Sequence, residues 1–136
     1  MNTSNIKKYA PQARNDFIAA MRKQAAKYGI TADSILPAEQ KGDLLLIGDQ
    51  VFPLSVMKSR EKLIKRIQTS SFEQTIDYIA YSWFNRLCAI RYMECKGLLD
   101  HGRRVLSSAD GSAGLPQILE ECLDIELPGL NTSRVA

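Results

Sequence analysis

The stretch YSWFNRLCAIRYMECKG, residues 81–97, contains the only tryptophan of the 136-residue chain and ends in a glycine. No proline or glycine interrupts the sequence between Ser71 and Gly97, so one helix can run unbroken over 71–96 and stop at the glycine. Ser70 and Glu73 match the capping-box pattern, in which their side chains bond to each other's free backbone N–H groups. The sequence therefore predicts one long central helix.

Both sides of this helix carry uncharged side chains. At about 100° per residue, one apolar stripe is formed by Phe72, Ile76, Ile79, Ala80, Trp83, Leu87 and Ile90. The opposite side has no ionised group and carries Tyr81, Asn85, Cys88, Ala89 and Tyr92. A helix without a charged face is usually covered on both sides. We expect a covered helix, with Cys88 and Cys95 as small buried apolar residues.

Glu94 falls on the apolar stripe, with Arg86 and Arg91 beside it. An unpaired buried carboxylate costs several kcal/mol, and Arg91 lies three residues earlier on the same side. The spacing predicts an internal ion pair of Arg91 with Glu94, which is more common than a catalytic role for such a group. Trp83, Asn85, Arg86, Arg91 and Glu94 are the predicted polar network of an interface or of the core.

The rest of the chain predicts a mainly α fold. A short arm over 1–10 precedes an amphipathic helix over 11–28, with Pro11 in its first turn and Gly29 after its end. Before the central helix, the sequence predicts a loop over 30–42, a β-hairpin over 43–53 and a second amphipathic helix over 54–68. After the central helix, it predicts a short strand over 103–107, a loop over 109–114 and a short helix over 116–124. The expected organisation is one helical domain over 1–124 and an irregular tail over 125–136.

The helix over 54–68 has a basic face against a single acid, Glu61. This face consists of Lys58, Arg60, Lys62, Lys65 and Arg66. Such a face can neutralise DNA phosphates, and solvated helix faces have the same composition, so both interpretations stay open here. Arg103 and Arg104 beside His101 form a weaker basic cluster, and the glycines of 105–114 are typical of a surface loop rather than of a cofactor loop.

Composition bounds the class of protein. Hydrophobic residues make up 45%, charged residues 24%, and the net charge is +3, as in a folded domain that is only mildly basic. The three cysteines, Cys88, Cys95 and Cys122, have no CxxC spacing, and the single histidine has no ligand partner, which disfavours a disulfide framework and a metal site. No apolar run reaches the roughly 18 residues of a membrane span. We expect a cytoplasmic protein without metal or membrane contact.

The segment over 81–94, YSWFNRLCAIRYME, resembles a helix of the adenine-specific DNA methyltransferases of bacteriophage-exclusion (BREX) systems, the PglX family. The resemblance extends to the opening MNTSNIKKYAPQARNDFIAAMRKQAAKYGI, to GDLLLIGDQVFP and to RVLSS. It covers most of the chain in the same order. The resemblance implies the N-terminal helical region of a much longer enzyme that uses S-adenosylmethionine to methylate the adenine amine and mark host DNA in phage defence.

The resemblance does not give this chain catalytic residues. The family's catalytic tetrapeptide contains a Pro-Pro pair, and the sequence has none. We therefore expect a non-catalytic domain or fragment without a cofactor of its own. Its implied partners are the methyltransferase domain of the parent protein, DNA and other BREX proteins. The alternative is a stand-alone module that binds nucleic acid or protein.

Overall fold

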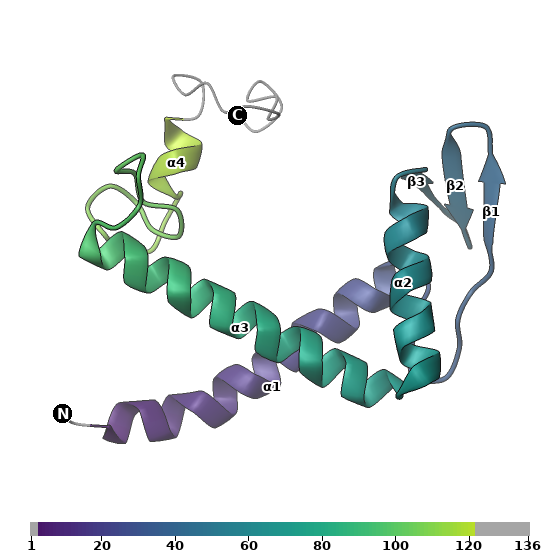
Figure 1. The fold of residues 1–136 in the computed structure, drawn as a ribbon, viewed down its shortest axis with the longest axis horizontal. Helices are drawn as coiled ribbons and strands as arrows, with labels where there is room; N and C mark the ends of the chain where they lie inside the picture. Colours follow the sequence, from purple (N-terminus) through teal and green to yellow (C-terminus); the bar gives the residue numbers. More distant parts are fainter. Residues whose placement is uncertain (1–2, 122–136) are drawn as a thin grey trace. The chain divides into compact units, whose positions relative to one another are not determined.

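A computed structural model describes residues 3–121, which divide between two compact units at Phe84 and Asn85, so that the described parts of the units are 3–84 and 85–121. The elements are α1 (Ser4–Lys27), β1 (Ala38–Lys41), β2 (Leu44–Ile47), β3 (Gln50–Pro53), α2 (Val56–Thr69), α3 (Phe72–Lys96) and α4 (Gln117–Glu120) (Figure 1). Helix α3 is continuous through the division between the units. The predicted mainly α fold, with a long central helix and a small antiparallel sheet, is confirmed.

Helix α1 begins earlier than predicted, so the short arm predicted over 1–10 is wrong for 4–10. It starts at Ser4 and contains Pro11 in its interior instead of in its first turn. Proline removes the N–H that would bond to the carbonyl of Lys7, but this turn is exposed, and water can reach that carbonyl. At the other end, Gly29 has a φ of +73°, and the N–H of Ile30 bonds to the carbonyl of Ala25. This glycine-terminated end is the one predicted.

The sheet has three strands in the order β1-β2-β3, with both neighbours antiparallel. The predicted hairpin is β2 and β3, where Ile47 pairs with Gln50 across a turn that holds Gly48 at a φ of +58°. The predicted loop over 30–42 is wrong for 38–41, which form the edge strand β1. All four residues of β1 are exposed, so the strand has none of the alternation of apolar and polar residues that marks a half-buried strand.

The first unit has two apolar clusters. The sheet side is built on buried Leu45, Ile47 and Phe52, against which Tyr28, Val56 and Met57 pack. The helical side is built on buried Ala25, Ile30 and Ile76, with Ile18, Met21, Leu63, Ile64, Ile67 and Phe72 packed on them. Helix α2 supplies residues to both clusters and therefore joins the sheet to the helices.

Helix α3 begins at Phe72, one residue after the predicted start, and its cap differs from the predicted capping box. The hydroxyl of Ser71 accepts a hydrogen bond from the N–H of Gln74 at 3.2 Å, which makes Ser71 the capping residue. Ser70 instead donates to the carbonyl of Arg66 at the end of α2, and Glu73 pairs with Arg22 of α1. The capping residue is therefore Ser71 instead of the predicted Ser70.

The second unit is described over 85–121, and among these residues only Glu94 and Ser107 are buried. The predicted strand over 103–107 is wrong, since these residues form an irregular loop. The short helix α4 begins at Gln117 after Pro116, close to the prediction, and ends at Glu120. The expected tail over 125–136 and the expected end of this helix at 124 lie outside the described residues. The predicted division at 124/125 therefore stays a prediction.

Candidate functional site

The basic face of α2 is narrower than the sequence suggests. Lys58, Lys62 and Lys65 are exposed, and at 100° per residue they fall within an arc of about 60°. Arg66 is exposed next to them, with its guanidinium carbon 3.8 Å from the centre of the Tyr78 ring. This contact is a cation–π pair. The exposed cations of α2 are thus three lysines in one row and one arginine stacked on an aromatic ring.

Arg60 does not belong to this face. It lies on the opposite side of α2 and is only 8% exposed. Its Nε donates to the carbonyl of Tyr28 at 2.9 Å, and its Nη2 donates to the carbonyl of Leu36. Burial lowers the pKa of the guanidinium from its ordinary value. Arg60 holds the end of α1 to the loop before β1, and its predicted role as a phosphate contact is wrong.

Several predicted residues of α3 are exposed in this structure. Trp83 is 45% exposed, so its predicted place in a core stripe is wrong, and Asn85 and Arg86 are exposed as well. Cys88 and Cys95 are free thiols at the surface, which corrects their prediction as buried residues. Cys122 lies outside the described residues. The uncharged side of α3 therefore faces outward in the described residues, with Tyr81 67% and Tyr92 60% exposed.

Glu94 is the centre of the second unit, and its pairing with Arg91 is present as predicted. The Glu94 side chain has no exposed surface. One carboxylate oxygen accepts from the backbone N–H of Val105 at 2.9 Å and of Leu106 at 2.8 Å. The other accepts from the Ser107 hydroxyl at 2.8 Å and from the Arg91 guanidinium. Glu94 thus fixes the loop over 105–107 onto α3.

The electrostatics of Glu94 follow from these contacts. Burial on its own raises the pKa of the carboxyl, because it disfavours the charged form. Hydrogen bonds from the Leu106 N–H, Arg91, Ser107 and the Val105 N–H outweigh burial and lower the pKa to about 2. The hydrogen bond between Arg91 and Glu94 raises the pKa of the Arg91 guanidinium. A carboxylate that accepts four hydrogen bonds and is charged at neutral pH has no free lone pair for acid–base catalysis, so Glu94 is a structural group.

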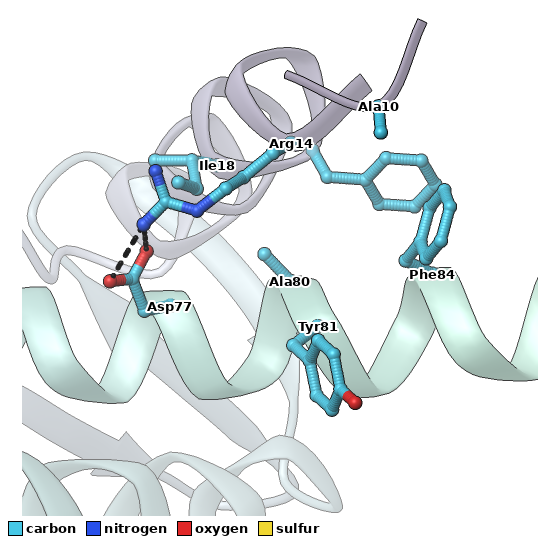
Figure 2. Close-up of a pocket in the computed structure, with 8 residues that line it drawn as sticks. Ala10, Arg14, Ile18, Asp77, Ala80, Tyr81 and Phe84 are labelled. Carbon is cyan, nitrogen blue, oxygen red and sulfur yellow. Dashed lines mark hydrogen bonds and ion pairs between the residues drawn. The ribbon is translucent and has the colours of Figure 1, made fainter. Parts of the chain in front are cut away.

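The first unit contains a pocket that the sequence does not predict (Figure 2). It lies between α1 and the beginning of α3 and has a volume of about 340 Å³. Arg14 Nη2 lies 3.1 and 3.2 Å from the two carboxylate oxygens of Asp77 at one end. The rings of Phe17 and Phe84 meet edge to face at 5.6 Å between centres. Helical spacing places Phe17 on an apolar face, but nothing in one sequence pairs Arg14 with a carboxylate 63 residues away.

The remaining candidate polar groups form hydrogen bonds and ion pairs with other residues of the second unit. The N–H of Arg103 donates to His101 Nδ1, and the Arg103 side chain pairs with Glu121 at 2.8 Å. Hydrogen bonds from Ser108 and Ser112 lower the pKa of Asp110 to about 2, as in a self-contained turn. Within residues 3–121 no three His, Cys, Asp or Glu side chains gather at metal-binding distance. None of the helices described there has the length and apolarity needed to cross a membrane.

Comparison with known proteins gives two relatives, while no family model matches the chain. The adenine-specific methyltransferase BrxX of Escherichia coli O9:H4 (strain HS) is 52% identical over 112 residues, which are 79% of this chain and 9% of that protein. The adenine-specific methyltransferase PglX of Lacticaseibacillus casei (strain Zhang) is 30% identical over 138 residues, 93% of this chain and 11% of that protein. The chain is thus a homologue of a segment of the BREX adenine-specific methyltransferases BrxX and PglX, about one tenth of their length.

Proposed function

We propose that the chain is the N-terminal, non-catalytic helical part of a BREX-type DNA adenine methyltransferase that marks host DNA in phage defence. The observation that carries the proposal is the match of 79% and 93% of this chain to about a tenth of two proteins named as adenine-specific methyltransferases. The cofactor S-adenosylmethionine and the catalytic tetrapeptide would belong to the rest of the enzyme. The other BREX proteins would be further partners.

The surface of the chain supports a packing role within a larger protein. Large apolar side chains on α1 and α3 are more than 40% exposed, among them Ile6, Tyr9, Tyr81, Trp83 and Tyr92. Soluble proteins rarely leave aromatic residues exposed in such numbers on two helices unless another surface covers them. Trp83, Asn85, Arg86 and Arg91 would contribute to that interface, with Glu94 holding α3 in shape behind it.

The assignment is tested by exchanging segments in the full-length E. coli relative. The 136-residue chain alone is expected to give no heat of binding when it is titrated with S-adenosylmethionine, whereas full-length BrxX should bind it. BrxX whose matched segment is replaced by this chain should still methylate adenine in a DNA substrate, because the homologous surface is kept. Saturable binding of S-adenosylmethionine to the isolated chain would contradict the non-catalytic role, and an inactive but folded exchange protein would contradict the shared role.

A second candidate function is contact with the DNA backbone through the lysine row of α2. Lys58, Lys62 and Lys65 are spaced four and three residues apart, which places their Cα atoms about 6 and 4.5 Å apart along the helix axis. That spacing suits successive phosphates, and residues 1–84 carry twelve Lys and Arg against eight Asp and Glu, which concentrates positive charge in this unit. Arg60 does not contribute, because both its contacts are internal.

Reversing the three lysines to glutamate is expected to abolish binding to a duplex of arbitrary sequence at low salt. Three phosphate contacts predict that wild-type affinity falls roughly 40-fold between 50 and 200 mM salt. Fluorescence anisotropy with a labelled duplex measures both effects. The matched control reverses Lys23, Lys27 and Lys41, which are exposed and change the net charge equally. Equal losses in the two variants, or no salt-dependent binding by the wild type, would contradict a site on α2.

A further inference from the structure

The pocket between α1 and α3 is lined mainly by apolar side chains (Figure 2). Its apolar walls come from Ala10, Phe17, Ala80 and Phe84, and the paired Arg14 and Asp77 lie at one end. A volume of about 340 Å³ is at the lower end of the range for sites that bind small ligands. The two charged groups at the pocket, Arg14 and Asp77, are paired with each other, so the pocket offers mainly shape and apolar surface.

The apolar surface continues along α1 beyond the pocket. Ile6, Ala10, Ala13 and Phe17 are four, three and four residues apart and therefore lie on one stripe. Ala13 is 2% exposed within the packed part, whereas Ile6 is 57% exposed one turn before the pocket. This continuation makes the site an elongated surface with one deeper position. Such a shape fits a protein segment with one large apolar side chain better than a small molecule.

The charge around the pocket is positive and unbalanced. Residues 4–15 contain Lys7, Lys8 and Arg14 and no acid, and the first acid of the chain, Asp16, accepts a hydrogen bond from Gln12. The two α3 carboxylates that meet α1, Glu73 and Asp77, are paired with Arg22 and Arg14. In the described residues, Lys7 and Lys8 have no ion pair. At 100° per residue Lys7 lies on the same side of α1 as Ala10 and Arg14, whereas Lys8 lies on the far side. The surface beside the pocket therefore offers Lys7 to a carboxylate.

We propose that this pocket receives a large apolar side chain of an acidic, linear segment in the rest of the methyltransferase. The apolar side chain enters between Ala10, Phe17 and Phe84, and a flanking Asp or Glu residue approaches Lys7. The inference rests on the proposed function, because it takes the partner from the same enzyme. A second copy of this chain is a poorer occupant, since a symmetric contact at this surface would bring the two Lys7 side chains together without an acidic partner.

The test presents the whole 136-residue chain with overlapping 15-residue peptides that span the E. coli BrxX sequence. Peptides that combine Trp, Phe or Leu with several Asp or Glu are expected to bind, and their affinity is then measured by fluorescence anisotropy. Ala10→Trp should weaken this binding at least about tenfold, because the indole occupies the pocket from its exposed rim. Ala20→Trp is the matched control, since Ala20 is exposed on α1 and does not line the pocket.

The charge requirement is tested separately. Lys7→Glu should weaken binding about three- to tenfold at 50 mM salt, and the difference should shrink in 0.5 M salt. Lys8→Glu, at an exposed position on the far side of α1, changes the net charge equally and should leave the affinity within about twofold. Circular dichroism verifies that each variant keeps its helices.

The outcomes separate this inference from the proposed function. Absence of binding by every acidic apolar peptide, or equal affinity of the Ala10→Trp and Ala20→Trp variants, would overturn the pocket as a docking site. Self-association of the chain that Ala10→Trp abolishes would overturn the acidic partner in favour of a second copy. The role as a methyltransferase segment would survive each of these results, because it is decided by the cofactor titration and the segment exchange.

Discussion

Replacing Glu94 with glutamine is expected to release the loop over 105–107 from α3. Glutamine keeps the side-chain volume but loses the negative charge to which Arg91 and the two backbone N–H groups donate hydrogen bonds. The amide NH₂ of glutamine is a donor, so it would face other donors at a position where the carboxylate accepts hydrogen bonds. Breaking such a buried charged network costs roughly 2–4 kcal/mol. Hydrogen exchange at the Val105 and Leu106 amides measures the effect directly, because both N–H groups bond to Glu94. Their protection should fall by about two orders of magnitude.

The pH dependence gives an independent check on the same residue. The folded pKa of Glu94 is lowered to about 2, below the ordinary value of 4.5. Its contribution to stability is therefore fully present above pH 4.5 and is lost as the pH falls toward 2. Protection of the two amides should decline over this range in the wild type and stay flat in the glutamine variant.

The control for Glu94 is Glu120→Gln, a change at an exposed carboxylate of the same unit. It removes the same charge and should leave the protection of Val105 and Leu106 unchanged. If Glu94→Gln and Glu120→Gln behaved alike, net charge rather than the buried network would govern the loop. Ser107→Ala removes one hydrogen bond of the same carboxylate and should cost about 1 kcal/mol.

The elements of the fold follow from local sequence where a periodic apolar pattern exists. The long helix over 72–96 has no interrupting Gly or Pro, and its glycine stop at Gly97 was predictable for that reason. β1 carries no such pattern, because an exposed edge strand is fixed by the backbone of β2 rather than by its own side chains. The predicted strand over 103–107 is wrong although its residues favour β-structure. The backbone N–H groups of Val105 and Leu106 bond to the Glu94 side chain instead of to another strand.

The candidate sites were predictable to different degrees. The Arg91 and Glu94 pair follows from spacing on one helix, whereas Ser107 comes from a loop whose path the sequence does not give. The sequence does indicate that Arg60 is buried, since at 100° per residue it falls in the middle of the apolar face made by Val56, Leu63, Ile64 and Ile67. The pocket depends on a crossing of α1 and α3, and helical periodicity within each helix does not specify the partner helix.

Arg60→Met is expected to destabilise the first unit by about 3 kcal/mol, because methionine keeps much of the apolar stem and removes both hydrogen bonds. The carbonyls of Tyr28 and Leu36 would lose their donor beside a buried side chain, and the positive charge near the end of α1 would be lost as well. Arg60→Lys keeps the charge but lacks the planar fork that reaches both carbonyls, so about half the loss is expected. Urea unfolding measures both variants. Lys62→Met on the exposed side of α2 is the control and should stay within about 0.5 kcal/mol of the wild type.

An Arg60→Met variant as stable as the wild type would mean that apolar burial of the stem alone joins α2 to the end of α1. The DNA measurement then distinguishes the two roles considered for this residue. Because Arg60 is only 8% exposed, Arg60→Lys should leave binding to the duplex unchanged where the variant is folded, whereas reversal of the lysine row should remove it. A drop in DNA affinity with unchanged stability would instead place the guanidinium at the phosphate surface and contradict the buried position.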